Sequence, residues 1–332
     1  MAQMKYFYEL TISSSPHAHS PVTTQTIMRD MLIALVPALL GSIYFFGFRA
    51  LLVTLVSAAA CVFFEWGFCK IRKLHCKTYD LSAVVTGVLL AFVCPVTIPY
   101  WTIILGDFFA IVLVKMLFGG LGKNIVNPAL AGRAFLFSWP VLMSNWVKVG
   151  FDNAAGLLST ADAVTAATPM SAMHQGALPE ESILDMFLGN IGGCIGETSA
   201  LLLIIGFIYL LYRKVITARI PLAYIGTVAI LAFLFPQGND RIAWMAAQVF
   251  GGGLMLGAIF MATDYVTSPL TKLGQIVYGI GCGVITILIR YFGGYSEGVT
   301  YAILCMNACA VLLDKIGRPV KFGAPKKEAA KK

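Results

Sequence analysis

Long apolar stretches follow one another along most of this chain, and short charged or Pro- and Gly-rich connectors separate them. The stretches are about 17 to 20 residues long, which is the length that crosses a hydrocarbon core of about 30 Å as a helix. We therefore predict an all-α polytopic membrane protein with about ten transmembrane helices. The predicted spans cover residues 31–48, 50–69, 81–96, 102–118, 124–146, 194–212, 220–235, 242–262, 273–290 and 298–313.

The fifth span is the least regular, because Pro128, Gly132 and Pro140 interrupt it. A broken helix is tolerated at membrane depth only where protein or a cavity covers the freed backbone groups. One long polar connector separates five spans from five, which is compatible with two inverted five-helix halves that build a site from broken helices. Short echoes agree with this hypothesis: Asp80-Leu-Ser-Ala resembles Glu197-Thr-Ser-Ala, and Asn127-Pro128-Ala-Leu resembles Ser268-Pro269-Leu-Thr.

Charge placement predicts the orientation in the membrane. If the N-terminus is cytoplasmic, eighteen Lys and Arg residues fall in the inside segments and four in the outside segments. This bias favours cytoplasmic termini. The expected organisation is a cytoplasmic segment at residues 1–30, a first transmembrane half at 31–146, an extracytoplasmic connector at 147–193, a second half at 194–313 and a basic cytoplasmic tail at 314–332. Trp244 and other aromatic residues near predicted span ends are expected to form an interfacial belt.

Composition narrows the class of protein. With 58% hydrophobic and 12% charged residues, the chain excludes a water-soluble globule. The net charge of +8 does not indicate nucleic acid, because the basic residues lie in connectors and the tail, without interleaved aromatic residues. The tail fits anionic membrane lipid instead. The first thirty residues hold no early apolar core and do not resemble a cleavable signal peptide, so we expect a bacterial inner-membrane protein inserted by its own spans.

The cysteines do not suggest a metal site. Six of the eight fall inside or at the ends of apolar runs, and no two form a C-x-x-C pair. Cys305 and Cys309 share a helical face, but no His or carboxylate accompanies them. We therefore expect buried apolar thiols and no bound metal.

Intramembrane carboxylates are costly and usually face a partner or a wet cavity. Glu65 and Asp107 lie inside predicted spans, and Asp264 lies near the end of one. These three are the candidates for an ion path, which needs hard oxygen ligands or protonatable groups. The alternative for each is a structural ion pair with Lys115, Lys123 or Arg133.

A glycine-rich segment precedes span five at Gly119, Gly120 and Gly122. It is not a phosphate-binding loop, because no strand precedes it and no Gly-Lys-Ser/Thr follows. Asn124 and Asn127 then begin a half-helix whose N-terminal amides could face an anionic or flavin group. Close packing without a ligand is the alternative.

The polar connector contains the sequence Asp162-Ala-Val-Thr165-Ala-Ala-Thr168, followed by Pro169. This small-residue, turn-prone segment offers the Thr168 hydroxyl to another enzyme's active site. The pattern is typical of flavinylated threonines, onto which a flavin transferase moves FMN from FAD as a phosphoester. His174 follows closely and could touch a flavin ring; the favoured alternative is a surface histidine. The alternative for the whole motif is an ordinary helix start in an exterior loop.

Further motifs extend the comparison from about residue 15 to residue 319. They resemble, in the same order, the D subunit of the Rnf complex and the related B subunit of the sodium-pumping NADH:quinone oxidoreductase. The matching stretches are Gly119-Gly-Leu-Gly-Lys-Asn-Ile-Val-Asn-Pro-Ala-Leu-Ala-Gly132, Gly196-Glu-Thr-Ser-Ala200, Met261-Ala-Thr-Asp-Tyr-Val-Thr-Ser-Pro269, Ile289-Arg-Tyr-Phe-Gly293, Glu297-Gly298 and Met306-Asn307.

The resemblance implies a membrane subunit of a ferredoxin:NAD oxidoreductase that couples electron flow to Na+ or H+ movement. The family's FMN-carrying threonine maps onto Thr168, with Thr165-Ala166 in place of the usual Ser-Gly. The family is also described as holding a non-covalent riboflavin. Partner subunits with flavin or iron-sulfur centres would handle ferredoxin and NAD, and a flavin transferase would mature the chain.

Two other functions remain open on the sequence. Ten spans with broken helices would serve an inverted-repeat permease or channel without a redox cofactor equally well. A scaffold subunit without its own redox role is the third possibility.

Overall fold

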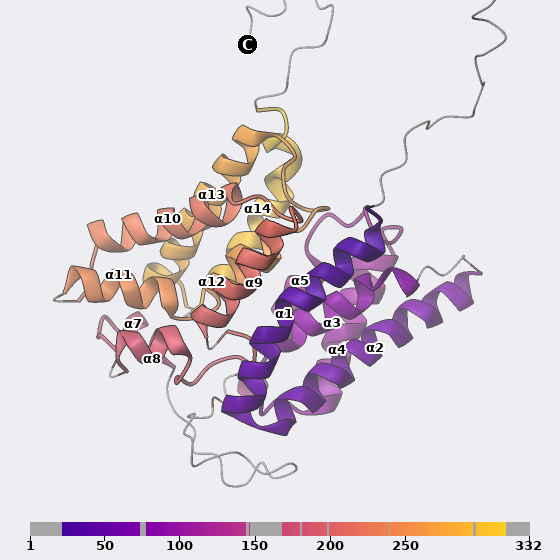
Figure 1. Ribbon diagram of the computed structural model, residues 1–332, viewed down its shortest axis with the longest axis horizontal. Coiled ribbons are helices and arrows are strands. Elements are labelled where there is room, and N and C mark those ends of the chain that lie inside the picture. The colour runs from indigo at the N-terminus through magenta and orange to yellow at the C-terminus, as the bar shows by residue number, and fades with distance from the viewer. Residues whose placement is uncertain are drawn as a thin grey trace, which may run out of the picture.

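The computed structural model describes residues 22–73, 78–143, 146, 168–179, 181–197, 199–238, 240–294 and 297–316. These residues contain helices and turns and no strand, which confirms the all-α prediction for the described part. The helices form two groups, one coloured indigo to magenta and one salmon to yellow (Figure 1). The groups correspond to the sequence before and after the polar connector.

The first group opens with two long helices, α1 (Thr24–Phe46) and α2 (Phe48–Arg72), which meet at Gly47 with φ 79°. α1 begins earlier than residue 31 because Thr23 and Thr26 form a capping box, in which each side chain bonds the other's backbone amide. A short 3-10 helix (Thr78–Asp80) precedes α3 (Ser82–Phe92). α4 (Tyr100–Phe108) continues as the π-helix η2 (Phe109–Met116).

The predicted interruption of span five is confirmed. α5 (Pro128–Leu136) begins at one proline and α6 (Pro140–Met143) at the other. The Asn127 side chain caps α5 by accepting from the amides of Ala129 and Leu130.

The second group begins with two short connector helices, α7 (Pro169–His174) and α8 (Ile183–Leu188). The longer helices are α9 (Ala200–Tyr212), α10 (Arg219–Leu234), α13 (Lys272–Phe292) and α14 (Val299–Leu313).

A second broken helix lies between α10 and α13. α11 (Arg241–Phe250) is followed by α12 (Leu254–Leu256) and the π-helix η3 (Gly257–Met261), with a bend of 58°. The apolar pattern alone predicts one unbroken span here. The bend falls at Gly251, Gly252 and Gly253, a run of three glycines that could have revealed it.

Close helix contacts depend on small residues, as is usual in membranes. A Cβ on Gly206 of α9 would clash with the carbonyl oxygen of Ala34 in α1, and one on Gly87 of α3 would lie 2.7 Å from the Ala58 Cα of α2. The α1–α9 contact therefore joins the two groups directly.

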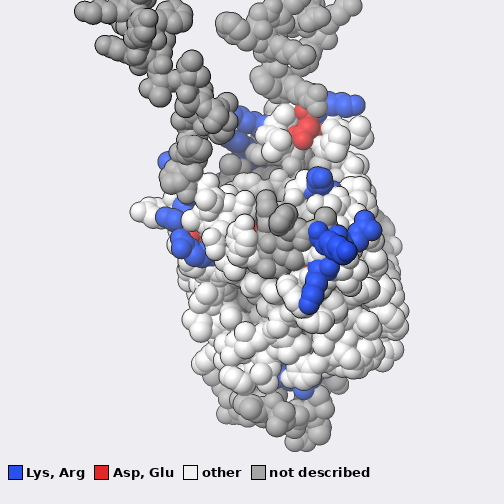
Figure 2. Space-filling view, turned by 90° about the vertical axis from the view of Figure 1, so that its right-hand side faces the viewer, with Lys and Arg blue, Asp and Glu red and all other residues white. Residues whose placement is uncertain are grey.

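Three described helices are long and apolar enough to cross a membrane, namely α1, α2 and α13, and a fourth span results if the bent pair counts as one. Four shorter apolar helices accompany them: α3, α9, α10 and α14. The outer surface is apolar as well, with Leu40, Phe63 and Ile208 all exposed. Figure 2 shows most of the visible Lys and Arg in the upper half and a smaller basic group at the lower end, with a broad uncharged region between them. The chain is therefore a multi-pass membrane protein.

The cysteines and Trp244 can be compared with the sequence-based expectations. The described cysteines are all free, and five of them are buried, although Cys305 is exposed on the apolar outer surface. The expected place of Trp244 in an interfacial aromatic belt is wrong: the side chain is fully buried and donates from Nε1 to the Tyr291 hydroxyl at 2.8 Å.

Candidate functional site

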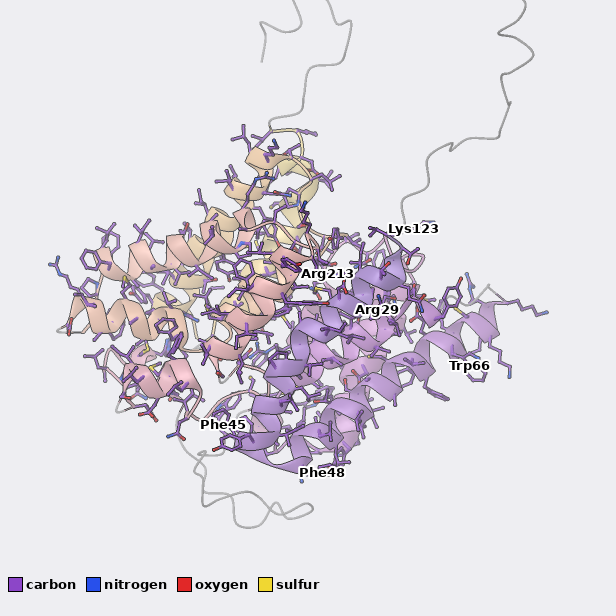
Figure 3. The ribbon with its side chains drawn as sticks, in the orientation of Figure 1. Arg29, Phe45, Phe48, Trp66, Lys123 and Arg213 are labelled. Carbon is purple, nitrogen blue, oxygen red and sulfur yellow. The ribbon has the colours of Figure 1, made fainter. Side chains whose placement is uncertain are left out.

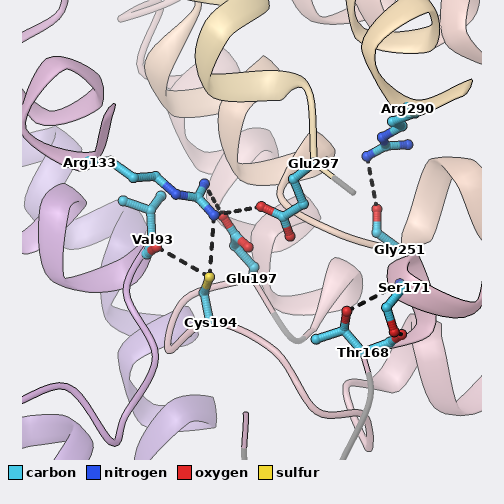
Figure 4. Close-up of polar contacts among 9 residues, drawn as sticks. All are labelled: Val93, Arg133, Thr168, Ser171, Cys194, Glu197, Gly251, Arg290 and Glu297. Atoms are coloured by element: carbon cyan, nitrogen blue, oxygen red, sulfur yellow. Dashed lines mark hydrogen bonds and ion pairs between the residues drawn. The ribbon is translucent and has the colours of Figure 1, made fainter. Parts of the chain in front are cut away.

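Thr168 immediately precedes α7 and caps that helix. Its Oγ1 accepts a 3.3 Å hydrogen bond from the Ser171 amide, and the Ser171 hydroxyl donates to the Thr168 carbonyl at 2.7 Å (Figure 4). Pro169 takes the first helical position, where its missing N–H costs nothing. Thr168 is 8% exposed, so it is a local cap rather than a freely exposed loop residue. Asp162 and Thr165 lie outside the described residues.

A small pocket adjoins Thr168 and has an empty volume of about 270 Å³. It lies where the connector meets the second broken helix and the turn before α14. The lining residues are Thr168, Pro169, Met170, Ile191, Gly192, Gly193, Glu197, Gly252 and Glu297.

Next to this pocket, Arg133 of α5 binds two carboxylates of the second group. Its Nη1 donates to Glu197 Oε1 at 3.0 Å, and its Nη2 donates to Glu297 Oε2. The same Nη2 lies 3.5 Å from Cys194 Sγ, whose thiol donates to the Val93 carbonyl at 3.2 Å. Figure 4 shows the Arg133 side chain reaching toward all three partners. We call Arg133, Glu197 and Glu297 the Arg133 triad.

The triad is in contact with the second broken helix. A Cβ on Gly253 would clash with Glu197 Oε1, so the absence of a side chain there makes room for the carboxylate. Gly253 also precedes α12, which has no side-chain cap. A carboxylate near a helix N-terminus is favoured by the helix dipole.

Arg290 of α13 stabilises the same break from the other side. Its Nη1 donates to the Gln248 carbonyl at 2.6 Å and to Gln248 Oε1 at 2.9 Å, and its Nη2 donates to the Gly251 carbonyl at 3.3 Å. His174 Nδ1 lies 2.9 Å from the Arg290 carbonyl oxygen, which joins α7 to α13. His174 is thus half-buried and engaged, not simply a surface histidine.

A second, larger pocket lies at the N-terminus of α5 and has an empty volume of about 650 Å³. Asn127 Nδ2 donates to the Met261 carbonyl at 3.2 Å, which joins α5 to the end of η3. Asn124 Oδ1 is buried without a hydrogen-bond partner, which is unusual for a polar atom. The other polar lining residues are Ser82, Thr86, Lys115, Asn127, Thr263 and Asp264.

The glycine-rich segment before α5 is a turn rather than a phosphate-binding loop. Gly119, Gly120 and Gly122 have φ of 109°, 87° and 91°, a region that favours glycine. The segment borders a wide cavity that Glu65 and Asp80 also line.

The three carboxylates considered for an ion path lie in different surroundings. Glu65 forms a buried ion pair with Lys115 at 3.1 Å, and Lys115 also donates to the Ser82 hydroxyl at 2.7 Å. Among the described residues, the hydrogen-bond partners of Asp107 are Ser57 and Cys61. Asp264, in the turn after η3, accepts from the Thr267 hydroxyl at 3.0 Å, and burial raises the pKa of its carboxyl above the ordinary value. The structure does not bring the three together.

No group of three His, Cys, Asp or Glu suited to a metal ion occurs among the described residues. The Arg133 triad and Arg290 were not recognised from the sequence as parts of one site. The signal available was charge at membrane depth, because Arg133 and Arg290 fall within predicted spans.

Comparison with known proteins places the chain in a family. Residues 11–323 match the model of the NQR2, RnfD, RnfE family. The chain is 46% identical to the D subunit of the Na(+)-translocating ferredoxin:NAD(+) oxidoreductase complex of Acetobacterium woodii, over 96% of each chain. It is 44% identical to the D subunit of the proton-translocating ferredoxin:NAD(+) oxidoreductase complex of Clostridium ljungdahlii, over 94% of this chain and 96% of the relative.

A more distant relative, the D subunit of the ion-translocating oxidoreductase complex of Actinobacillus succinogenes, is 34% identical over 93% of this chain and 96% of its own length. The relatives are thus named as subunits of ion-translocating oxidoreductase complexes. Together with the match to the family model over nearly the whole chain, these identities show that the chain belongs to the NQR2, RnfD, RnfE family.

Proposed function

We propose that this chain is the flavin-carrying membrane subunit of a ferredoxin:NAD oxidoreductase complex that couples electron transfer to Na+ or H+ translocation. The observation that carries the proposal is the position of Thr168. Its hydroxyl caps a short helix beside a pocket to which the connector, the second broken helix and Glu197 and Glu297 of the Arg133 triad all contribute. Relatives of similar length bear the corresponding complex names.

The residues around Thr168 fit a phosphoester. The transfer would join the Thr168 oxygen to the FMN phosphorus of FAD, break the FAD pyrophosphate bond, release AMP and leave the hydroxyl proton to solvent or the transferase. The adjoining pocket is lined by Gly192, Gly193 and Gly252, which have no side chains to obstruct a phosphate, and by Glu197 and Glu297, whose negative charges Arg133 offsets. It is too small to enclose the rest of FMN. When bound, FMN accepts electrons one or two at a time.

We assign a second, non-covalent flavin, riboflavin, to the larger pocket. That pocket is mainly apolar, as a flat aromatic ring requires, and it contains a few polar groups that could fix its orientation. The unpartnered Asn124 Oδ1 is available to accept a hydrogen bond from a ring or ribityl donor. Lys115 also lines the pocket, where its ammonium is paired with Glu65 and donates to the Ser82 hydroxyl.

We further propose ten spans in two inverted halves. The support is reciprocal: Asn127 at the start of α5 bonds Met261 at the end of η3, while Arg133 within α5 bonds Glu197 beside the start of α12. The start of α5 therefore lies near the end of η3, and the last turn of α5 lies near the start of α12. Such crossed half-helices are typical of inverted-repeat transporters.

The orientation in this proposal has both termini in the cytoplasm and the Thr168 connector outside a bacterial inner membrane. Arg29, Lys123 and Arg213 lie at one end of the helices, and Phe45 and Phe48 lie at the other (Figure 3). This grouping of basic residues supports the positive-inside assignment. The partners in the proposal are the other membrane and flavin or iron-sulfur subunits of the complex, a flavin transferase and membrane lipid.

The competing function is a permease or channel, in which Thr168 carries nothing. Mass spectrometry distinguishes the two. The chain is produced with and without a flavin transferase, and the proteolytic peptide containing Thr168 is examined. We expect the mass of FMN less water to be added at Thr168 only when the transferase is present. A peptide that stays unmodified while the same transferase modifies a known substrate would favour the permease.

A further inference from the structure

Asp107 is the most completely buried carboxyl among the ion-path candidates. It lies on α4 in the interior of the first group, with 0% of its surface exposed. Its Oδ1 lies 2.7 Å from Ser57 Oγ and 3.2 Å from Cys61 Sγ, both on α2. Its Oδ2 is buried without a hydrogen-bond partner.

The Ser57 hydroxyl makes two short contacts, and the number of protons available decides which group donates in each contact. Ser57 Oγ is 2.7 Å from Asp107 Oδ1 and 2.8 Å from the Gly87 carbonyl oxygen of α3. A serine hydroxyl has one proton to donate. The Gly87 carbonyl has none, so Ser57 donates to it. The second contact then needs a proton from Asp107, which makes the carboxyl the donor and Ser57 the acceptor.

The neighbouring charges agree with an uncharged Asp107. Lys115 of η2 is bonded to Glu65, and Arg133 of α5 is bonded to Glu197 and Glu297. Cys61 and Cys94 are buried thiols. No ion pair to Asp107 occurs within the part of the chain that the structure describes. Burying Asp107 as an unpaired carboxylate in the interior of the first group would cost roughly several kcal/mol of folding free energy, whereas burying the neutral acid costs far less.

We infer that Asp107 is a proton-binding site inside the first group, held as a carboxylic acid that donates to Ser57. The role of this site rests on the proposed coupling to ion translocation. The chemistry is the uptake and release of one proton by the Asp107 carboxyl. Release breaks the Asp107 O–H bond and passes the proton to water or another base. The Ser57 hydroxyl can then turn from Gly87 to Asp107 and donate to the new carboxylate.

This arrangement differs from those of the other two candidates. Glu65 is already balanced by Lys115, and Asp264 accepts two hydrogen bonds in a turn. Asp107 and Asp264 both have neutral partners, but of the three carboxyls only Asp107 has a buried oxygen without a hydrogen-bond partner. Uptake and release of a proton there require no exchange of an ion-pair partner.

Infrared difference spectroscopy tests the inference on the purified full-length chain. The wild type is compared with Asp107→Asn at neutral pH, in H2O and D2O. The amide of Asn can still donate to Ser57, so the variant is expected to fold. We expect the wild type to show a carboxylic acid C=O band that shifts in D2O and is lost in Asp107→Asn. The control Glu65→Gln should retain that band.

Ser57→Ala provides a second readout. Removing the acceptor should move the same C=O band to higher frequency without abolishing it. Loss of carboxylate bands in Asp107→Asn, with no change in the C=O region, would overturn the inference. Flavin content, measured on the same samples, reports the proposed function separately, because the band should persist in chain without flavin.

Discussion

Arg133 and Glu197 form a buried 3.0 Å ion pair between residues 64 positions apart in the sequence. Glu297, 164 positions from Arg133, binds the same guanidinium. One side chain of α5 therefore joins the first group of helices to two separate segments of the second. The pair also lies between the two broken helices and beside the Thr168 pocket. The contacts that join the two groups of helices therefore adjoin the proposed FMN attachment site.

Replacing Arg133 tests how strongly this cluster holds the two groups together. Arg133→Met should lower the free energy of unfolding by about 3–5 kcal/mol, because Glu197 and Glu297 would remain buried without a cation. Thermal unfolding in detergent measures the effect. The matched control is Arg213→Met: Arg213 pairs with Asp30 at 3.1 Å but is 44% exposed, so its loss should lower the stability clearly less than the loss of Arg133. Equal effects of the two substitutions would contradict this reading of the cluster.

The contact of Glu197 with the second broken helix predicts a large difference between two glycines. Gly253→Ala should destabilise the chain by roughly 1–3 kcal/mol, because the added methyl overlaps a carboxylate that Arg133 holds in place. Gly226→Ala in α10 meets nothing within 4 Å and should be neutral or stabilising by about 0.5–1 kcal/mol. Denaturation of both variants in the same detergent gives the comparison. The prediction fails if Gly253→Ala is as stable as Gly226→Ala.

The Glu65–Lys115 ion pair should show strong coupling in a double-mutant cycle. Either Lys115→Met or Glu65→Gln alone disrupts a buried pair, and Lys115→Met leaves an uncompensated carboxylate. The double variant restores neutrality and should lose less stability than the sum of the two single variants, by about 0.5–3 kcal/mol. Simple additivity would mean that the two charges do not interact in solution.

Much of the fold follows from apolar periodicity, but the site does not. Prolines at 128 and 140 predicted the break between α5 and α6. The break at the three glycines 251–253 was not predicted, because hydropathy gives one continuous apolar run there. α1 begins early because of a local Thr23–Thr26 cap that hydropathy does not register. The local motif alone predicts Thr168 as the FMN site, and this stays a prediction. The Arg133 triad was not predicted, because no local pattern specifies which distant carboxylates meet one arginine.

Cysteine labelling tests the orientation. Leu178→Cys, in the connector, should react with a membrane-impermeant maleimide in intact cells, whereas Lys214→Cys, between α9 and α10, should react only after the membrane is opened. Both positions are exposed, so accessibility to the reagent differs by side of the membrane alone. The unsubstituted chain gives the background from Cys305. The opposite labelling pattern would reverse the assigned topology.

The central claim is that Thr168 carries FMN. The measurement is in-gel flavin fluorescence after denaturing electrophoresis of chain co-produced with a flavin transferase, for the wild type, Thr168→Val and Thr168→Ser. Valine keeps the shape of threonine without the hydroxyl, and serine keeps the hydroxyl. We predict a fluorescent band at 35.8 kDa plus the flavin for the wild type, and none for Thr168→Val even though it inserts normally. Thr168→Ser should recover part of the signal. A non-fluorescent wild-type chain, or undiminished fluorescence in Thr168→Val, would contradict the claim.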